Sequence, residues 1–431
     1  MEDIDRKIPP QVRDLTIPEL PQMRTRTLDS GVEMIIFDSS EAEMCRLTTM
    51  VKGGIMDFGR VASTMTMRML PRGSRSWPGG RLMSLMDYNG AKLMAASSGI
   101  YGYVTMFSLN SKLDNVLRPY YDMIYRPMFS KRSFEVVQRK AIAAAMTNLE
   151  NVNFLSSMAL NELVYGNDFP ATQPLTPESL CAQKPENLAR NWLSQLSPES
   201  TRLFLTGRIT PAVEASVARL FDKVPERQGV SVPKLDSTIR RAAPGSLKQV
   251  SRPQSLQETV FCAIPTSVQP FAQAKYELNI IVNLLGGYFG SRLNESLREQ
   301  KGLTYGVGAY SEFYAEGTVV KIATNCRRGS AETVVSEIKN EILRLCDAST
   351  YTEQEIDSLR RYITTSLVES FDTPFSITEF MEMRYDEKGV CQADNCLKIY
   401  RKLLAELDAE RLAGYARSYL NPENMLTVVV G

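Results

Sequence analysis

Arg298 and Tyr305 carry side chains that could act together on a ligand, because they lie close to each other in the chain. Both lie in the stretch SRLNESLREQKGLTYGVGAY, which runs from Ser291 to Tyr310. A guanidinium and a phenol can each donate hydrogen bonds to a carbonyl oxygen, so a converging pair could hold or polarise a carbonyl group. The alternative is structural, with Arg298 ending a helix in solvent and Tyr305 filling a sheet. Residue types alone leave both interpretations open.

The elements that must position this pair are visible in the same stretch. Leu293 and Leu297 recur at helical spacing, with the apolar stem of Arg298 on the same side. Gly302 can adopt the positive φ that ends a helix, and Leu303–Val307 is typical of a short strand. The stretch therefore predicts a helix–glycine–strand corner that holds the cation and the phenol on either side of a fixed turn.

Composition removes several classes of function. The 431 residues include no histidine, which excludes His-based general bases, Ser-His or Cys-His nucleophiles and imidazole metal ligands. Lys plus Arg is 50 and Asp plus Glu is 49, so no basic excess indicates nucleic acid or an anionic membrane as a partner. We expect no membrane span, since no run of 18 apolar residues occurs.

Seven scattered cysteines predict reduced, buried thiols and a cytoplasmic protein. The opening MEDIDRKIPP has no apolar core of a signal peptide, and a periplasmic location stays open if such a peptide was removed. Cys391 and Cys396 share one loop, but a structural zinc needs four ligands, so we predict no metal site there.

An internal repeat defines the architecture. LARNWLSQLSPESTRLFLTG begins at Leu188 and LAGYARSYLNPENMLTVVVG begins at Leu412, and the two align over twenty positions without a gap. The strand expected at Gly102–Asn110 and the helices after it have counterparts from Gly317–Asn325 onward. The sequence therefore predicts an α+β fold of two tandem homologous domains, each a mostly antiparallel sheet with helices packed on one face.

Domain boundaries follow from the repeat and from a change in composition. Residues 230–252 carry two prolines, several serines and five basic residues without a sustained helical or alternating pattern, and we interpret them as the linker. The predicted N-terminal domain is then 1–229 and the C-terminal domain, which carries Arg298 and Tyr305, is 253–431.

The stretch around Arg298 resembles the C-terminal-half signature of the pitrilysin/insulinase-type metallopeptidases. In that family a segment R-E-x-x-G-L-x-Y carries an Arg and a Tyr that hold the substrate backbone near zinc, and here it falls on Arg298 and Tyr305. Leu28–Gly54 resembles the family's opening strands with their Gly-Gly pair. The similarity extends to the end of the chain and fits the two-chain branch that includes the mitochondrial processing peptidases. It implies two homologous halves that face each other as half of a clamshell.

The family's zinc ligands are missing from their matching positions. The inverted H-x-x-E-H helix precedes a Met-Leu-x-x-Gly, and its His, Glu and His positions here hold Thr64, Met67 and Arg68. The further Glu ligand of the family is replaced by Ala145, or by Ala144 if the alignment shifts by one. We therefore expect no zinc in this chain and no peptidase activity from the chain alone.

The resemblance implies a division of labour between two chains. This chain would be the non-catalytic, substrate-binding subunit of a heterodimeric zinc peptidase, and Arg298 and Tyr305 would act in the active site of a zinc-bearing partner. A catalytically inactive scaffold, or a peptide-holding homodimer of the same fold, is the alternative. The retained pair favours the first hypothesis, because a scaffold needs neither residue.

Overall fold

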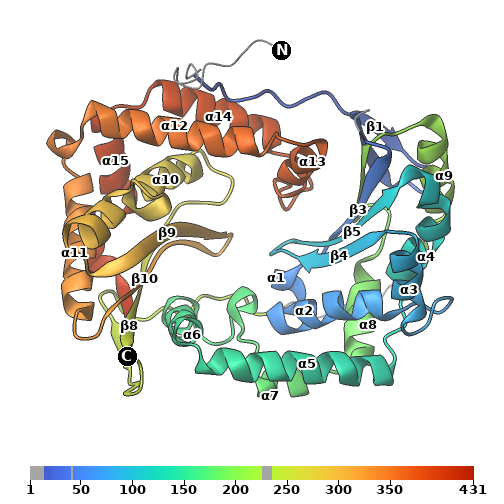
Figure 1. The fold of residues 1–431 in the computed structure, drawn as a ribbon, viewed down its shortest axis with the longest axis horizontal. Coiled ribbons are helices and arrows are strands. Elements are labelled where there is room, and N and C mark those ends of the chain that lie inside the picture. The colour runs from blue at the N-terminus through green and yellow to red at the C-terminus, as the bar shows by residue number, and fades with distance from the viewer. Residues whose placement is uncertain (1–13, 40–41, 226–234) are drawn as a thin grey trace, which may run out of the picture.

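A computed structural model describes residues 14–39, 42–225 and 235–431, which form two sheets flanked by helices (Figure 1). The N-terminal sheet has six strands in the spatial order β1 (Arg24–Thr27), β2 (Glu33–Asp38), β6 (Thr201–Gly207), β3 (Met44–Lys52), β5 (Tyr101–Leu109) and β4 (Lys92–Ser97). The C-terminal sheet has five strands in the order β7 (Leu247–Val250), β11 (Leu426–Val430), β8 (Gln257–Thr266), β10 (Gly317–Arg327) and β9 (Thr304–Tyr314).

The two sheets share one topology. The order β2-β6-β3-β5-β4 in the first half corresponds strand for strand to β7-β11-β8-β10-β9 in the second. In each half the first pair is parallel and the other three pairs are antiparallel. β1 is an addition to the N-terminal sheet and has no counterpart among the described strands of the C-terminal one. The predicted α+β class and the mostly antiparallel sheets are confirmed.

The helices follow the strands in the same sequence in both halves. In the first half they are α1 (Ile55–Phe58), α2 (Arg60–Met69), α3 (Arg81–Tyr88), α4 (Leu113–Tyr125), α5 (Lys131–Glu150), α6 (Val152–Tyr165), α7 (Pro177–Cys181), α8 (Pro185–Gln195) and α9 (Pro211–Phe221). In the second half they are α10 (Ala274–Val282), the π-helices η4 (Asn283–Gly287) and η5 (Asn294–Gln300), α11 (Ala331–Leu345), α12 (Glu353–Glu369), α13 (Pro374–Glu382), α14 (Ala393–Ala405) and α15 (Ala409–Tyr419). Short 3₁₀ turns are η1 (Leu70–Arg72), η2 (Asn110–Lys112), η3 (Pro170–Thr172), η6 (Ala348–Thr350) and η7 (Pro422–Asn424).

Each sheet has a main core on the face that its own helices cover. In β3, Leu47 and Val51 point into this core, where they meet Leu117 of α4 and Trp192 of α8. The strand alternation sends every second side chain there and leaves the others for the opposite, inner face. Within the described ranges, no helix is both long and apolar enough to cross a bilayer.

The inner face of each sheet is covered by a helix from the other half. α6 of the N-terminal half packs on β8 and β11, and α13 of the C-terminal half packs on β6 (Figure 1). α6 and α13 occupy the same place in the repeat, because each is the third long helix after its pair of adjacent strands. The two halves have therefore exchanged equivalent helices.

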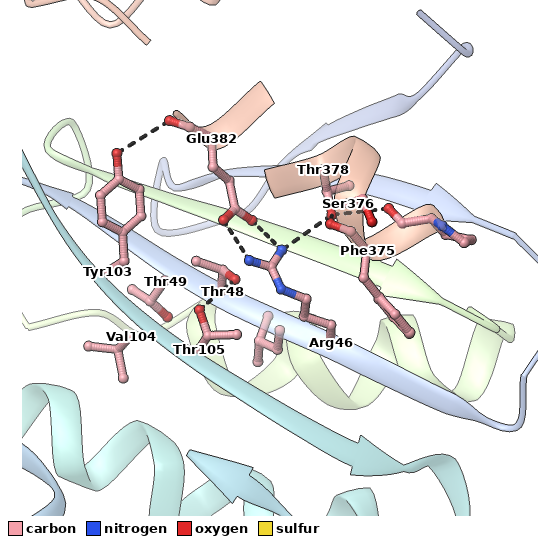
Figure 2. A network of polar contacts seen from close by, with 12 residues as sticks. Arg46, Thr48, Thr49, Tyr103, Val104, Thr105, Phe375, Ser376, Thr378 and Glu382 are labelled. Atoms are coloured by element: carbon pink, nitrogen blue, oxygen red, sulfur yellow. Dashed lines mark hydrogen bonds and ion pairs between the residues drawn. The ribbon is translucent and has the colours of Figure 1, made fainter. Parts of the chain in front are cut away.

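A buried ion pair fastens α13 to the N-terminal sheet (Figure 2). Arg46 of β3 donates to both carboxylate oxygens of Glu382, at 2.5 and 2.7 Å, and to Thr378 at 3.2 Å. Both charged side chains are about 5% exposed or less. Tyr103 of β5 adds a hydrogen bond from its hydroxyl to the main-chain oxygen of Glu382, at 3.3 Å. The paired geometry satisfies the charges that burial would otherwise leave uncompensated.

Polar contacts also fasten α6 to the C-terminal sheet. The hydroxyls of Ser156 on α6 and Thr259 on β8 are hydrogen-bonded. Lys321 of β10 donates to Asn161 of α6 at 2.7 Å and pairs with Glu312 of β9 at 2.7 Å. The helix exchange is thus held by buried polar groups on both sides.

The segment predicted as a linker does more than connect the halves. Its first residues, up to 234, lie outside the described residues. Leu247–Val250 forms β7, which pairs with β11 in parallel, and Arg240 and Ala242 bond through their amides to the end of α6. Leu247–Val250, at the end of the segment interpreted as the linker, therefore belongs to the C-terminal sheet. The four residues LKQV carry no strong alternation, and main-chain pairing at the sheet edge decides their state.

Candidate functional site

The helix that carries Arg298 is the π-helix η5. The spacing of Leu293 and Leu297 predicted a helix but did not indicate its wider turns. Asn294, on its first turn, ties it to the following strand. The Asn294 side chain donates to the main-chain oxygens of Tyr288 and Val307, at 3.1 and 3.0 Å, and accepts from the amide of Val307 at 3.2 Å. The predicted corner between helix and strand is therefore fixed by a buried amide side chain as well as by its turn, where Gly302 has a φ of +57°.

Tyr305 projects from a β-bulge at the start of β9. Thr304 pairs with Cys326 and Val307 pairs with Thr324, so two residues of β9 face one residue of β10. The Thr304 hydroxyl holds this bulge by accepting from the amide of Gly306 at 3.1 Å. The Tyr305 side chain is 90% exposed. The bulge turns the phenol away from the sheet, and the alternative in which Tyr305 fills the sheet is wrong.

Arg298 is partly exposed and stacks on an aromatic ring. Its guanidinium carbon lies 4.3 Å from the centre of the Phe289 ring, and its Nε lies 3.4 Å from a carboxylate oxygen of Glu299. No hydrogen bond joins Arg298 to Tyr305 in the part of the chain that the structure describes. Their convergence on one carbonyl group therefore stays a prediction.

Met67, which the resemblance matched to the family's catalytic Glu, is part of the N-terminal core. It is 7% exposed, and its methyl group lies 2.9 Å from where a Cβ on Gly102 would be. The ring of Trp192 lies 3.2 Å from the same Cβ position on Gly102. The thioether therefore fills the volume beneath the sheet and leaves no charged group to activate a water molecule there.

Thr64 and Arg68 lie on another side of α2. Thr64 is half-buried and Arg68 is exposed, one turn apart and in line with Arg60 at the start of the helix. Arg60 interacts electrostatically with Tyr314 and Lys321 of the C-terminal half, which shows that the start of α2 faces the other half. The two His positions thus hold one hydroxyl and one solvated cation, which do not bind zinc.

Ala145 lies opposite this helix on α5. It is 2% exposed and packs in a small apolar cluster with Val61, Met65 and Met69 of α2. Ala144 is exposed, so Ala145 is the member of the pair that faces α2. No cluster of three or more potential metal ligands occurs in the described ranges. Cys391 is half-buried and Cys396 is buried.

Two sheet edges frame the inner side of the molecule. β4 and β9 are the last strands of their sheets, so each has an edge without a neighbouring strand among the described elements. The hairpin between β4 and β5 rests against Gly54, where a Cβ would lie 2.5 Å from the oxygen of Ser98 and 2.6 Å from that of Gly99. Only glycine permits this approach, which explains the Gly-Gly pair in the sequence.

The structure also contains a cleft where the two halves meet, which we call the inter-half cleft. Its volume is about 560 Å³, and both halves line it. Its wall includes Tyr101 and Tyr103 from the first half and Phe271, Lys275 and Phe313 from the second. These residues lie up to 212 positions apart, from 101 to 313, and share no local motif, so the sequence analysis did not find the cleft.

Comparisons with known proteins agree with the resemblance seen in the sequence. Residues 184–363 match the family described as "Peptidase M16 inactive domain". A curated relative, "Non-peptidase homolog YmxG" of Helicobacter pylori, is 22% identical over 270 residues, which cover 60% of this chain and 59% of that relative. The match thus spans less than two thirds of the relative's length.

Solved structures of low sequence identity share the fold. The M16 inactive domain from Pseudomonas fluorescens has a TM-score of 0.79 at 18% identity, and the match covers 95% of this chain and 98% of that one. The periplasmic protease PqqL of Escherichia coli has a TM-score of 0.74 at 13% identity, and the match covers 96% of this chain but 48% of PqqL. This chain therefore has the fold of about half of the longer protein.

Proposed function

Because this chain is a member of the pitrilysin-type (M16) family that lacks the zinc motif, we propose that it is the non-catalytic, substrate-binding subunit of a two-chain zinc peptidase. The zinc would be held by a homologous partner chain. The substrate would be an extended peptide, held at a sheet edge between the two chains.

One contrast within the molecule carries this proposal. By the resemblance, Met67 takes the position of the catalytic Glu and Ala145 that of a zinc-binding Glu, and both are packed in apolar cores. Tyr305, in contrast, is turned into solvent by a bulge that the hydroxyl of Thr304 maintains. Holding an aromatic ring in solvent by a β-bulge costs free energy and gives a scaffold protein no advantage. The exposure suits a side chain that contacts a ligand.

We assign separate roles to the two side chains. Arg298 would donate to a main-chain carbonyl of the peptide. Its guanidinium already stacks on the Phe289 ring, so less side-chain entropy would be lost when the peptide binds. Tyr305 would donate to the carbonyl oxygen that becomes negative as the partner's zinc-bound water attacks. A donor placed at a developing oxyanion contributes to catalysis because it binds the transition state more strongly than the substrate.

The test combines this chain with a zinc-bearing homologue from the same organism and measures peptide cleavage. We expect activity that requires both chains and is lost with a chelator. Arg298→Ala and Tyr305→Phe should each lower kcat by about 100-fold, the scale for removing one transition-state donor.

Matched controls are available in the same chain. Tyr88→Phe removes a hydroxyl that is 88% exposed on α3, and Arg411→Ala removes a surface cation on α15; neither should change kcat. If the mixture is inactive, or if the Tyr305 and Arg298 variants cleave as fast as wild type, the chain is a scaffold or a peptide-holding protein and the proposal is wrong.

A further inference from the structure

The wall of the inter-half cleft combines aromatic side chains with a half-buried lysine, Lys275. Tyr101 and Tyr103 come from β5, and Phe271 and Phe313 come from the loop before α10 and from β9. Met383, which is 62% exposed, adds a flexible thioether at the end of α13. Tyr101 is buried, Tyr103 and Phe313 are half-buried, and Phe271 is exposed. Aromatic and methionine side chains gathered in one concave surface are typical of a binding site for apolar groups.

Lys275 lies on the first turn of α10. Its ammonium lies 5.0 Å from the centre of the Phe313 ring and 5.9 Å from that of Phe271. It makes no ion pair with any residue that the structure describes, and its burial lowers its pKa. A half-buried cation without an acidic partner favours an anion from outside the chain.

Lys275 differs from the other charged residues of the cleft in its burial. Lys52 and Lys388 lie in the lining together with Asp57, Glu316 and Glu387, and all five are exposed. The three cations and three carboxylates of the lining balance. Lys275 is the one among these six whose charge is half-buried and lacks an ion pair in the part of the chain that the structure describes.

We propose that the inter-half cleft is a specificity subsite for an aromatic side chain of the bound peptide that is followed by an aspartate or glutamate. The aromatic side chain would pack between the rings of both halves, and the carboxylate would bind the Lys275 ammonium. The subsite rests on the proposed function in taking a peptide as the ligand, and its spacing from the cut bond also rests on the role proposed there for Tyr305.

The position of the cleft also sets the distance along the peptide between the subsite and the bond that is cut. Phe313 lies eight residues after Tyr305 on β9, which is about 26 Å at roughly 3.3 Å per residue. An extended peptide that reaches both therefore carries its aromatic-acidic pair about eight residues from the bond that is cut.

Peptide binding to the isolated chain tests the subsite without any cleavage. The probes are fluorescent, N-acetylated and C-terminally amidated peptides that contain Phe-Glu, Phe-Gln or Ala-Glu in an otherwise constant sequence. We expect the Phe-Glu peptide to bind about tenfold more tightly than either of the others, the scale of one charge-assisted contact or one aromatic contact. A fourth peptide, Phe-Gln with a free C-terminal carboxylate, should bind no better than its amide.

Variants assign the effect to the cleft. Lys275→Met keeps a long side chain against the two rings and should make the Phe-Glu and Phe-Gln peptides equal, while Lys398→Met, at a surface ion pair on α14, should change nothing. Phe271→Ala should weaken both Phe peptides and spare Ala-Glu. The subsite is wrong if no peptide binds, if only the free carboxylate matters, or if Lys275→Met keeps the preference for Phe-Glu.

Failure of the subsite and failure of the proposed function give different results. If the Phe-Glu preference depends on Lys275 but mixtures with the homologue never cleave, the subsite holds and the peptidase role is wrong. If cleavage depends on Arg298 and Tyr305 but ignores Lys275 and the Phe-Glu pair, the peptidase role holds and the subsite is wrong.

Discussion

Met67 and Ala145 lie in apolar surroundings where an ionised carboxylate has no partner. Met67 contacts the start of β5 and the ring of Trp192, and Ala145 packs against methionines of α2. A carboxylate placed there loses its hydration without gaining a metal ion or a hydrogen-bond donor. The packing of α2 and α5 thus disfavours a carboxylate at either position, in addition to the absence of histidine from the chain.

Ala145→Glu should lower the free energy of unfolding by roughly 3 kcal/mol or more, because it buries an unpaired charge and overfills a packed cluster. Ala144→Glu, one residue away and exposed on the same helix, should change it by less than about 0.5 kcal/mol. Urea unfolding followed by circular dichroism measures both. Equal stabilities of the two variants would contradict the placement of Ala145.

The exchange of α6 and α13 is the main feature at the level of elements. Each helix leaves its own half and covers the inner face of the other sheet, where Glu382 meets Arg46 and Ser156 meets Thr259. A buried ion pair of good geometry adds little net stability over an apolar contact, but it penalises any other placement of the helix. We infer that Arg46 and Glu382 select the position of α13 more than they stabilise the fold.

Glu382→Ala should therefore lower the free energy of unfolding by about 3–5 kcal/mol, because Arg46 stays buried without its partner. The double variant Arg46→Met with Glu382→Leu should recover most of that loss. Glu379→Ala, exposed on the same helix, serves as the control. A double variant at least as unstable as Glu382→Ala would show that the pair itself supplies the stability.

The whole molecule behaves as one unit if each half depends on a helix from the other. Neither sheet keeps its inner face covered when the other half unfolds, since α6 and α13 would be lost with it. Buried apolar surface in this arrangement couples the halves more strongly than the contacts between ordinary domains. The same coupling holds the inter-half cleft and the β9 edge in one fixed geometry.

The two tryptophans give a direct test of this coupling. Trp77 and Trp192 both belong to the first half, so their fluorescence reports that half alone. We expect the fluorescence and far-ultraviolet circular dichroism transitions in urea to coincide. Glu382→Ala, a change in the second half, should shift the tryptophan transition as well. Two separate transitions would show that the halves unfold independently.

Local patterns indicated the repeat and part of its elements. Apolar spacing predicted the helices after Gly102–Asn110 and their counterparts, and alternation predicted β5 and β10, because these signals come from neighbours within a few residues. Helices such as α3, α10 and α13 were not predicted. The spacing of Leu293 and Leu297 could not distinguish an α-helix from the π-helix η5, since both put the two leucines on one side. The bulge at Tyr305 was also hidden, because it depends on the register of β10.

The order of residues alone was enough to predict a duplicated α+β unit without a zinc motif, since a repeat and missing ligand types can be recognised without coordinates. Packing in three dimensions sets which sheets α6 and α13 cover, makes Leu247–Val250 a strand, and brings Tyr101 and Phe313 into one cleft. These features rest on contacts between residues far apart in the chain. Such contacts depend on how whole elements pack, and no short stretch of sequence encodes them.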